Sequence, residues 1–101
     1  MGLSAEVFRA LASEKRLLVL EWLRDPVGNF PPQREGDLLE DGVCVMFLAE
    51  KLGVAQPTAT AHLQALRRAG LVRAKRMGQW TYYRRDEAAI ERVKRAVGDG
   101  L

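Results

Sequence analysis

The side chains best suited to chemistry in this sequence lie between Val54 and Arg85. Lys and Arg donate charge-assisted hydrogen bonds to phosphate, and Gln and Thr can bond to the edges of bases. This stretch contains no Asp or Glu, although the whole chain has 16 basic and 13 acidic residues. Because an acid would repel phosphate, the stretch predicts a surface that binds a polyanion. Its basic residues are Arg67, Arg68, Arg73, Lys75, Arg76, Arg84 and Arg85.

The two halves of the chain carry opposite net charge. Residues 1–53 have six bases and nine acids, a net charge of −3, whereas residues 54–101 have ten bases and four acids, a net charge of +6. A basic half on a nearly neutral chain is typical of proteins that bind nucleic acid. The charge alone is equally compatible with an ordinary solvated cationic surface.

Length and composition exclude several classes of protein. A chain of 101 residues predicts one domain, residues 1–101. The sequence has neither an apolar run of about 20 residues nor a secretory signal, so we expect no membrane segment. A single cysteine fits a reducing cytoplasm. The absence of a glycine-rich phosphate loop and of a nucleophile–base pair predicts a chain that is not an enzyme and has no catalytic residues or cofactor.

The N-terminal half predicts three helices and one long loop. Leu3, Val7, Phe8 and Leu11 recur at helical spacing, which predicts that the first dozen residues form a first helix. Ser13 is a suitable N-cap for a second helix, which Asp25-Pro26 ends. Residues 26–42 contain three prolines and three glycines, which predicts a long loop that is either functional or mobile. Cys44, Leu48 and Leu52 then predict a short helix with one apolar stripe, ending at Gly53.

The C-terminal half predicts a helix, a hairpin and a last helix. Pro57 suits the first position of a helix that ends at Gly70 and places Ala59, Leu63 and Leu66 on its core face. Two short runs rich in β-branched and aromatic residues around Met77-Gly78 predict a β-hairpin. Asp86 is a suitable cap for the last helix. The order predicts a mainly α (α+β) winged helix-turn-helix, with about five helices and a two-stranded β-hairpin wing.

Three segments of the sequence resemble the ArsR/SmtB group of bacterial winged-helix repressors: LASEKRLLVLEWL, VCVMFLAEKLGVAQPTATAHLQALRRAGLV and KRMGQWTYYRR. The resemblance runs from about Leu11 to Val97 and is strongest over Phe47–Tyr83. It implies a homodimer, held mainly by the first and last helices, that binds a palindromic operator in double-stranded DNA. It also implies an effector that weakens the DNA complex.

The polar helix and the basic hairpin together predict the DNA contacts. The helix suits the major groove, and the hairpin suits flanking phosphates or the minor groove. The resemblance places His62 near the DNA, although core packing of this residue stays open. Relatives commonly carry Arg at the position of Ala61, so base reading would depend more on Gln56, Thr58 and Thr60 or on DNA shape. The predicted contacts are Gln56, Pro57, Thr58, Thr60, Ala61, His62, Gln64, Arg68, Arg73, Lys75, Arg76 and Gln79.

The first and last helices each have an apolar stripe, which predicts a dimer interface because one small core has little surface left to cover both. The alternative is that both stripes pack on their own core. Two recognition helices related by a two-fold axis would lie about 34 Å apart, one turn of DNA. The predicted interface residues are Leu3, Val7, Phe8, Leu11, Ile90, Val93 and Val97.

The sequence disfavours metal binding. Many members of the resembled group have a Cys-x-Cys pair, which here is reduced to Cys44 and Met46, and a lone thiolate is a poor site for soft metals. The last helix has no His. We expect Cys44 to be a small buried hydrophobe or, alternatively, a redox or electrophile-sensing thiol.

Two further hypotheses stay open at this point. The segment Pro26–Gly42, whose Asp37, Glu40 and Asp41 lead to Cys44, either shapes an effector pocket or buttresses the dimer. The alternative function is a winged-helix protein-interaction module whose basic face meets an acidic partner.

Overall fold

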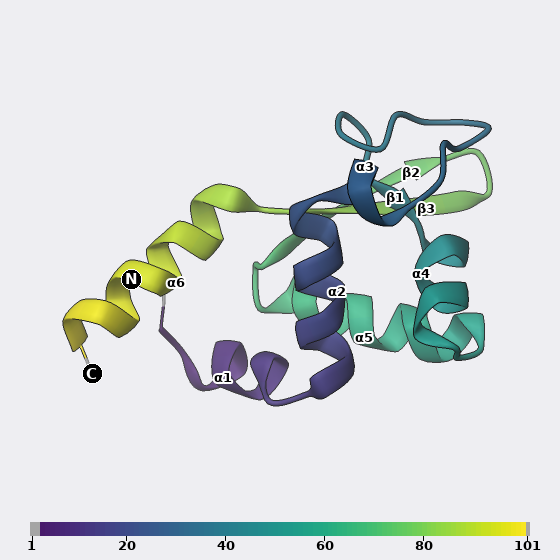
Figure 1. Cartoon of the computed structure of the whole chain (residues 1–101). Helices are drawn as coiled ribbons and strands as arrows, with labels where there is room; N and C mark the ends of the chain where they lie inside the picture. Colours follow the sequence, from purple (N-terminus) through teal and green to yellow (C-terminus); the bar gives the residue numbers. More distant parts are fainter. Residues whose placement is uncertain (1–2, 101) are drawn as a thin grey trace.

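The computed structural model describes residues 3–100, which form six helices and three strands in a body of 42 × 25 × 23 Å (Figure 1). The predicted winged helix-turn-helix is confirmed. No helix in the described part of the chain has the length and apolar character that crossing a membrane requires. The elements are α1 (Ala5–Leu11), α2 (Glu14–Arg24), α3 (Pro26–Asn29), β1 (Val43–Cys44), α4 (Val45–Leu52), α5 (Gln56–Arg68), β2 (Val72–Met77), β3 (Trp80–Arg85) and α6 (Glu87–Gly100).

Serine caps begin the first two helices. The Ser4 Oγ accepts a hydrogen bond from the Val7 backbone N–H at 3.1 Å, and the Ser13 Oγ accepts one from the Arg16 N–H at 3.3 Å. Such caps satisfy backbone donors that have no partner within the helix. The prediction that Ser13 starts the second helix is confirmed, whereas the first helix begins later than predicted and leaves Leu3 outside it.

The long loop predicted over residues 26–42 is shorter in the structure. Its first residues form α3, because Pro26 suits the first turn of a helix and the Asp25 side chain accepts a hydrogen bond from the Gly28 N–H at 3.2 Å. The prediction of a loop is therefore wrong over Pro26–Asn29. We call the remaining irregular segment, residues 31–42, the strap.

The predicted two-stranded hairpin wing is confirmed as β2 and β3. The sheet has a third strand that was not predicted, and its order is β1-β3-β2. Cys44 lies in β1, opposite Tyr82 of β3, and not in the predicted helix. Cys44 lies four residues before Leu48, a spacing typical of a helix, but α4 begins only at the next residue, Val45. The two residues of β1 cover an edge of β3 that would otherwise present unpaired backbone groups.

The helix-turn-helix consists of α4, α5 and the turn between them. Gly53 ends α4 in the left-handed conformation, with φ of 70°. Gln56 is the first residue of α5 and Pro57 the second, one position later than predicted. As expected, Ala59, Leu63 and Leu66 are fully buried in the core. These contacts fix the orientation of α5 and leave its other faces open.

The wing is the hairpin of β2 and β3. Met77 pairs with Trp80, so the turn contains Gly78 and Gln79. Because side chains alternate across a strand, the two tyrosines of β3 point to opposite faces. Tyr83 faces α5, and Tyr82 faces the strap. The same alternation determines which cations of the wing lie on the face directed towards α5.

The last helix, α6, extends away from the body of the molecule (Figure 1). It begins where the Asp86 carboxylate accepts a hydrogen bond from the Ala89 N–H at 2.9 Å, as predicted for its cap. No residue of α6 is buried within the chain. Packing against the core of its own chain therefore stabilises α6 only weakly.

Candidate nucleic-acid interface

The N-terminal end of α5 is exposed and carries no acid. Gln56, Pro57, Thr58 and Ala61 are exposed, and Thr60 is half-buried. We call these five residues the reading end. Their side chains are small or uncharged, so the backbone of α5 can approach a groove closely.

Gln64, which we predicted as a DNA contact, lies between α5 and the wing. Its Nε2 donates a hydrogen bond to the Tyr83 hydroxyl at 3.2 Å. This bond fixes the position of β3 relative to α5. Gln64 therefore links the two elements and is itself half-buried.

His62 is half-buried and contacts α2. Arg16 Nη1 lies 3.1 Å from His62 Nδ1, and because arginine only donates, Nδ1 must accept. The proton of the neutral ring is then on Nε2. Arg16 also donates to the backbone oxygens of Ala10 and Arg9, so it joins α1, α2 and α5. Nothing in the sequence indicates this contact, because the two residues are 46 positions apart.

We expect His62 to make the stability of the fold dependent on pH. Burial lowers the pKa of His62 below its usual 6.5, and the charges of Arg16 and Lys15 lower it further. A lowered pKa contributes stability that is present above the unfolded-state value and is lost as the pH falls through the folded-state value. Urea denaturation from about pH 7 to about pH 5 should therefore show a steeper loss of stability for the wild type than for His62→Gln. Parallel curves for the two proteins would contradict this.

Two predicted cations of the wing are paired with acids from outside the 54–85 stretch. Arg73 Nε lies 3.1 Å from Asp86 Oδ2, and the Lys75 ammonium contacts the Asp41 carboxylate of the strap. The hydrogen bond from Lys75 is the main cause that holds the pKa of Asp41 below its usual value. The expectation that acids are excluded from this surface is thus wrong for the face of the wing that meets the strap.

Arg76 lies on the other face of the wing. In β2 it alternates with Lys75 and pairs with Thr81, on the face that also carries Tyr83 and is directed towards α5. Arg76 is exposed, and its Nε donates to the Gly78 oxygen at 3.0 Å. Gln79 is exposed in the turn beside it. The structure therefore places Arg76 on the face of the wing directed towards α5, and Arg73 and Lys75 on the face that meets the strap.

Arg68 lies at the opposite end of α5 from the reading end. Twelve residues separate it from Gln56, which corresponds to about 18 Å along a helix axis. It lines a shallow hollow together with Glu6 and Arg9 of α1. Its position suits a backbone phosphate outside the groove better than a base.

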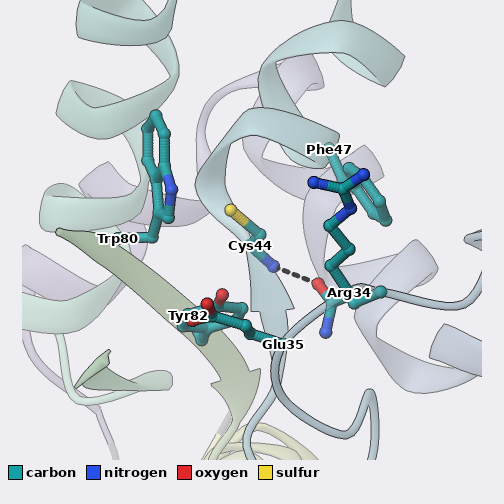
Figure 2. Close-up of a pocket in the computed structure, with 7 residues that line it drawn as sticks. Arg34, Glu35, Cys44, Phe47, Trp80 and Tyr82 are labelled. Atoms are coloured by element: carbon teal, nitrogen blue, oxygen red, sulfur yellow. Dashed lines mark hydrogen bonds between the residues drawn. The ribbon is translucent and has the colours of Figure 1, made fainter. Parts of the chain in front are cut away.

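The strap, β1, α4 and β3 line a half-open cavity of about 250 Å³ beside the wing (Figure 2). Cys44, Phe47, Trp80 and Tyr82 line it from the sheet and α4. Gln33, Arg34 and Glu35 line it from the strap. Cys44 is only 9% exposed, as expected for a small buried hydrophobe, and its backbone N–H donates to Gln33 Oε1 at 2.7 Å. Residues 3–100 contain no group of three His, Cys, Asp or Glu side chains that could hold a metal ion.

The predicted dimer residues differ in exposure. Val7 is buried within the chain, whereas Phe8 is 45% and Val97 37% exposed. Leu11, Ile90 and Val93 are partly buried against the core. Leu3 is also half-buried. An apolar hollow of about 230 Å³ remains between α2 and α6.

The fold and the exposed reading end define a winged helix-turn-helix protein that binds DNA, and comparisons with known proteins agree. A profile of the bacterial regulatory protein, arsR family, matches residues 38–74. The uncharacterized HTH-type transcriptional regulator YbzH of Bacillus subtilis is 47% identical over 88 residues, which cover 87% of this chain and 88% of YbzH. The solution structure of the homodimeric winged helix-turn-helix DNA-binding domain Mb0332 of Mycobacterium bovis has a TM-score of 0.64 at 33% identity, covering 94% of this chain and 77% of that one.

The chain belongs to the ArsR family of bacterial transcriptional regulators. It is a DNA-binding regulator and not an enzyme. The resemblance of the sequence to the ArsR/SmtB group is thereby confirmed.

Proposed function

We propose that the chain is a homodimeric repressor that binds a palindromic operator and is released from it by an effector. The observation that carries the proposal is the exposure of the reading end together with Arg76 on the face of the wing directed towards α5, since neither α5 nor the two strands of the wing contain an acid. The reading end would enter the major groove. Arg76 and Gln79 would reach the flanking backbone or the minor groove.

The state of α6 supports a dimer. An isolated chain leaves α6 without a buried residue and leaves the hollow beside α2 open. Apolar surface of this kind typically marks an interface. Phe8 and Val97 would add their exposed side chains to it. The related domain Mb0332 is described as homodimeric, which agrees with this proposal.

The remaining predicted contacts take supporting roles in this proposal. His62 keeps an N–H on Nε2, which would donate to a phosphate beside the groove. Arg68 would contact a phosphate farther along the backbone. Arg73 and Lys75 would act only after they leave Asp86 and Asp41, which lowers their contribution.

Retardation of duplex DNA tests the proposal. Fragments that flank the gene of this protein should be retarded at lower protein concentration than unrelated fragments of equal length, by at least tenfold at moderate salt. The discrimination should persist when non-specific DNA is added in excess. Equal affinity for all fragments would contradict sequence-specific repression, and no retardation even at low salt would favour an acidic protein as the partner of the basic face.

The two faces of the wing should differ in their effect on DNA binding. Arg76→Ala should lower affinity and reduce the slope of log K against log salt concentration by about one, because one phosphate contact is lost. Arg73→Ala removes the same charge from the face that meets Asp86, so its effect should be clearly smaller. Fluorescence anisotropy of a labelled operator over a range of salt concentrations measures both. Equal slopes for the two variants would contradict the assignment of faces.

A further inference from the structure

The cavity beside the wing has the lining of a binding site for a flat molecule. Phe47, Trp80 and Tyr82 contribute three aromatic rings from two different elements (Figure 2). Aromatic rings favour stacked or edge-to-face contact with another ring. The volume of about 250 Å³ is slightly below the ~300–1,000 Å³ of sites for drug-sized ligands. A molecule of one or two rings matches this space.

Polar groups with hydrogen-bonding capacity also line the cavity. Figure 2 marks one hydrogen bond among the residues drawn, from the Cys44 N–H to Gln33. The indole N–H of Trp80 and the hydroxyl of Tyr82 are thus not bonded to the other lining residues. Both can donate to a ligand. A ligand with an acceptor atom beside its ring would satisfy them.

The charges at the cavity cancel. Arg34 and Glu35 are neighbours in the strap, both are exposed, and both line the cavity. In Figure 2 Arg34 extends towards Phe47 and Glu35 towards Tyr82. Because the two charges cancel, the lining has no net charge to offset the loss of hydration of a charged ligand. An uncharged ligand loses less hydration when it enters the cavity.

We propose that this cavity is the effector site and that it binds an uncharged, planar aromatic molecule of one or two rings with a hydrogen-bond acceptor. The proposal rests on the proposed function, because an effector requires a DNA complex to weaken. The cavity is lined by the wing and by α4, the first helix of the helix-turn-helix. Trp80 pairs with Met77 next to the turn of the wing, and Phe47 belongs to α4 of the helix-turn-helix. A bound ring would therefore act on the wing and on α4 together.

Three probes of equal shape and different charge test the class of ligand: benzamide, benzoate and benzamidine. Titration into the ¹⁵N-labelled full chain without DNA is followed by the indole N–H signals in the NMR spectrum. Benzamide should shift the signal of Trp80 saturably and leave that of Trp22 unchanged, because Trp22 packs against Phe30 outside the cavity. Benzoate and benzamidine should bind at least threefold more weakly.

A pair of tyrosine variants provides the matched control. Tyr82→Phe keeps the ring and removes the hydroxyl of a residue that lines the cavity, so benzamide affinity should fall about three- to tenfold, the usual effect of one hydrogen bond. Tyr83→Phe removes a hydroxyl that bonds to Gln64 outside the cavity, and benzamide affinity should stay within about twofold.

Several results would overturn the proposal. They are the absence of a saturable shift at Trp80, an equal shift at Trp22, tighter binding of either charged probe, and equal losses in the two tyrosine variants. Saturating benzamide should also lower operator affinity at least threefold, and unchanged affinity would remove the effector role. If the chain failed to bind any DNA, the proposed function would fail, while the NMR titration would still show whether the cavity binds.

Discussion

Thr58→Glu should abolish specific DNA binding while leaving the fold intact. Thr58 is the third residue of α5 and is exposed at the reading end. A carboxylate at this position would face the phosphates of a bound operator, and like charges brought together at an interface cost several kcal/mol. A penalty of about 3 kcal/mol lowers affinity roughly a hundredfold. Anisotropy titration of a labelled operator measures the loss.

The same substitution should slightly stabilise the protein. An acidic side chain in the first turn of a helix interacts favourably with the helix dipole, by about 0.3–1 kcal/mol. The loss of DNA binding therefore cannot be attributed to unfolding. Ala88→Glu is the matched control, because it adds the same charge to the exposed first turn of α6. Operator affinity within about threefold of wild type for Ala88→Glu and a hundredfold loss for Thr58→Glu would localise the interface. Similar losses in both would indicate a general effect of net charge.

The elements that could be predicted from the sequence are those specified by local chemistry. Ser13 and Asp86 cap their helices through bonds to residues three positions away, and the core face of α5 follows from its period. Each of these signals comes from residues about one helical turn apart in the sequence. The helix-turn-helix, the wing and the residues of the reading end could therefore be placed without a structure.

The features that were missed depend on partners distant in sequence. Cys44 could be assigned to a strand only once Tyr82 was known to lie opposite it. Lys75 looks free in the sequence because Asp41 is 34 positions away. The same applies to Arg16 and His62. The sequence identifies which residues are charged, but the pairing of the charges depends on how the strap folds back over the wing.

Gly42, the last residue of the strap, lies close against the backbone of β3. It has a φ of +103°, which side chains other than glycine rarely adopt, and a Cβ placed there would lie 2.5 Å from the backbone oxygen of Tyr83. The obstacle is backbone of β3, which cannot move without disturbing the pairing of β1 with β3. The carbonyl of Gly42 also accepts a hydrogen bond from Gln33 Nε2 at 3.0 Å. Gly42 therefore controls how closely the strap can approach the wing.

Gly42→Ala should destabilise the fold by about 3 kcal/mol or more, because left-handed strain of about 1–2 kcal/mol adds to the steric overlap. Gly53→Ala is the matched control. Gly53 also has a positive φ, of 70°, but a Cβ there meets no atom within 4 Å, so only the strain of about 1 kcal/mol should remain. Urea denaturation at one fixed protein concentration gives both values, since the stability of a dimer depends on concentration. Equal losses of stability in the two variants would show that the strap can shift at Gly42 and that the fold does not depend on this close contact.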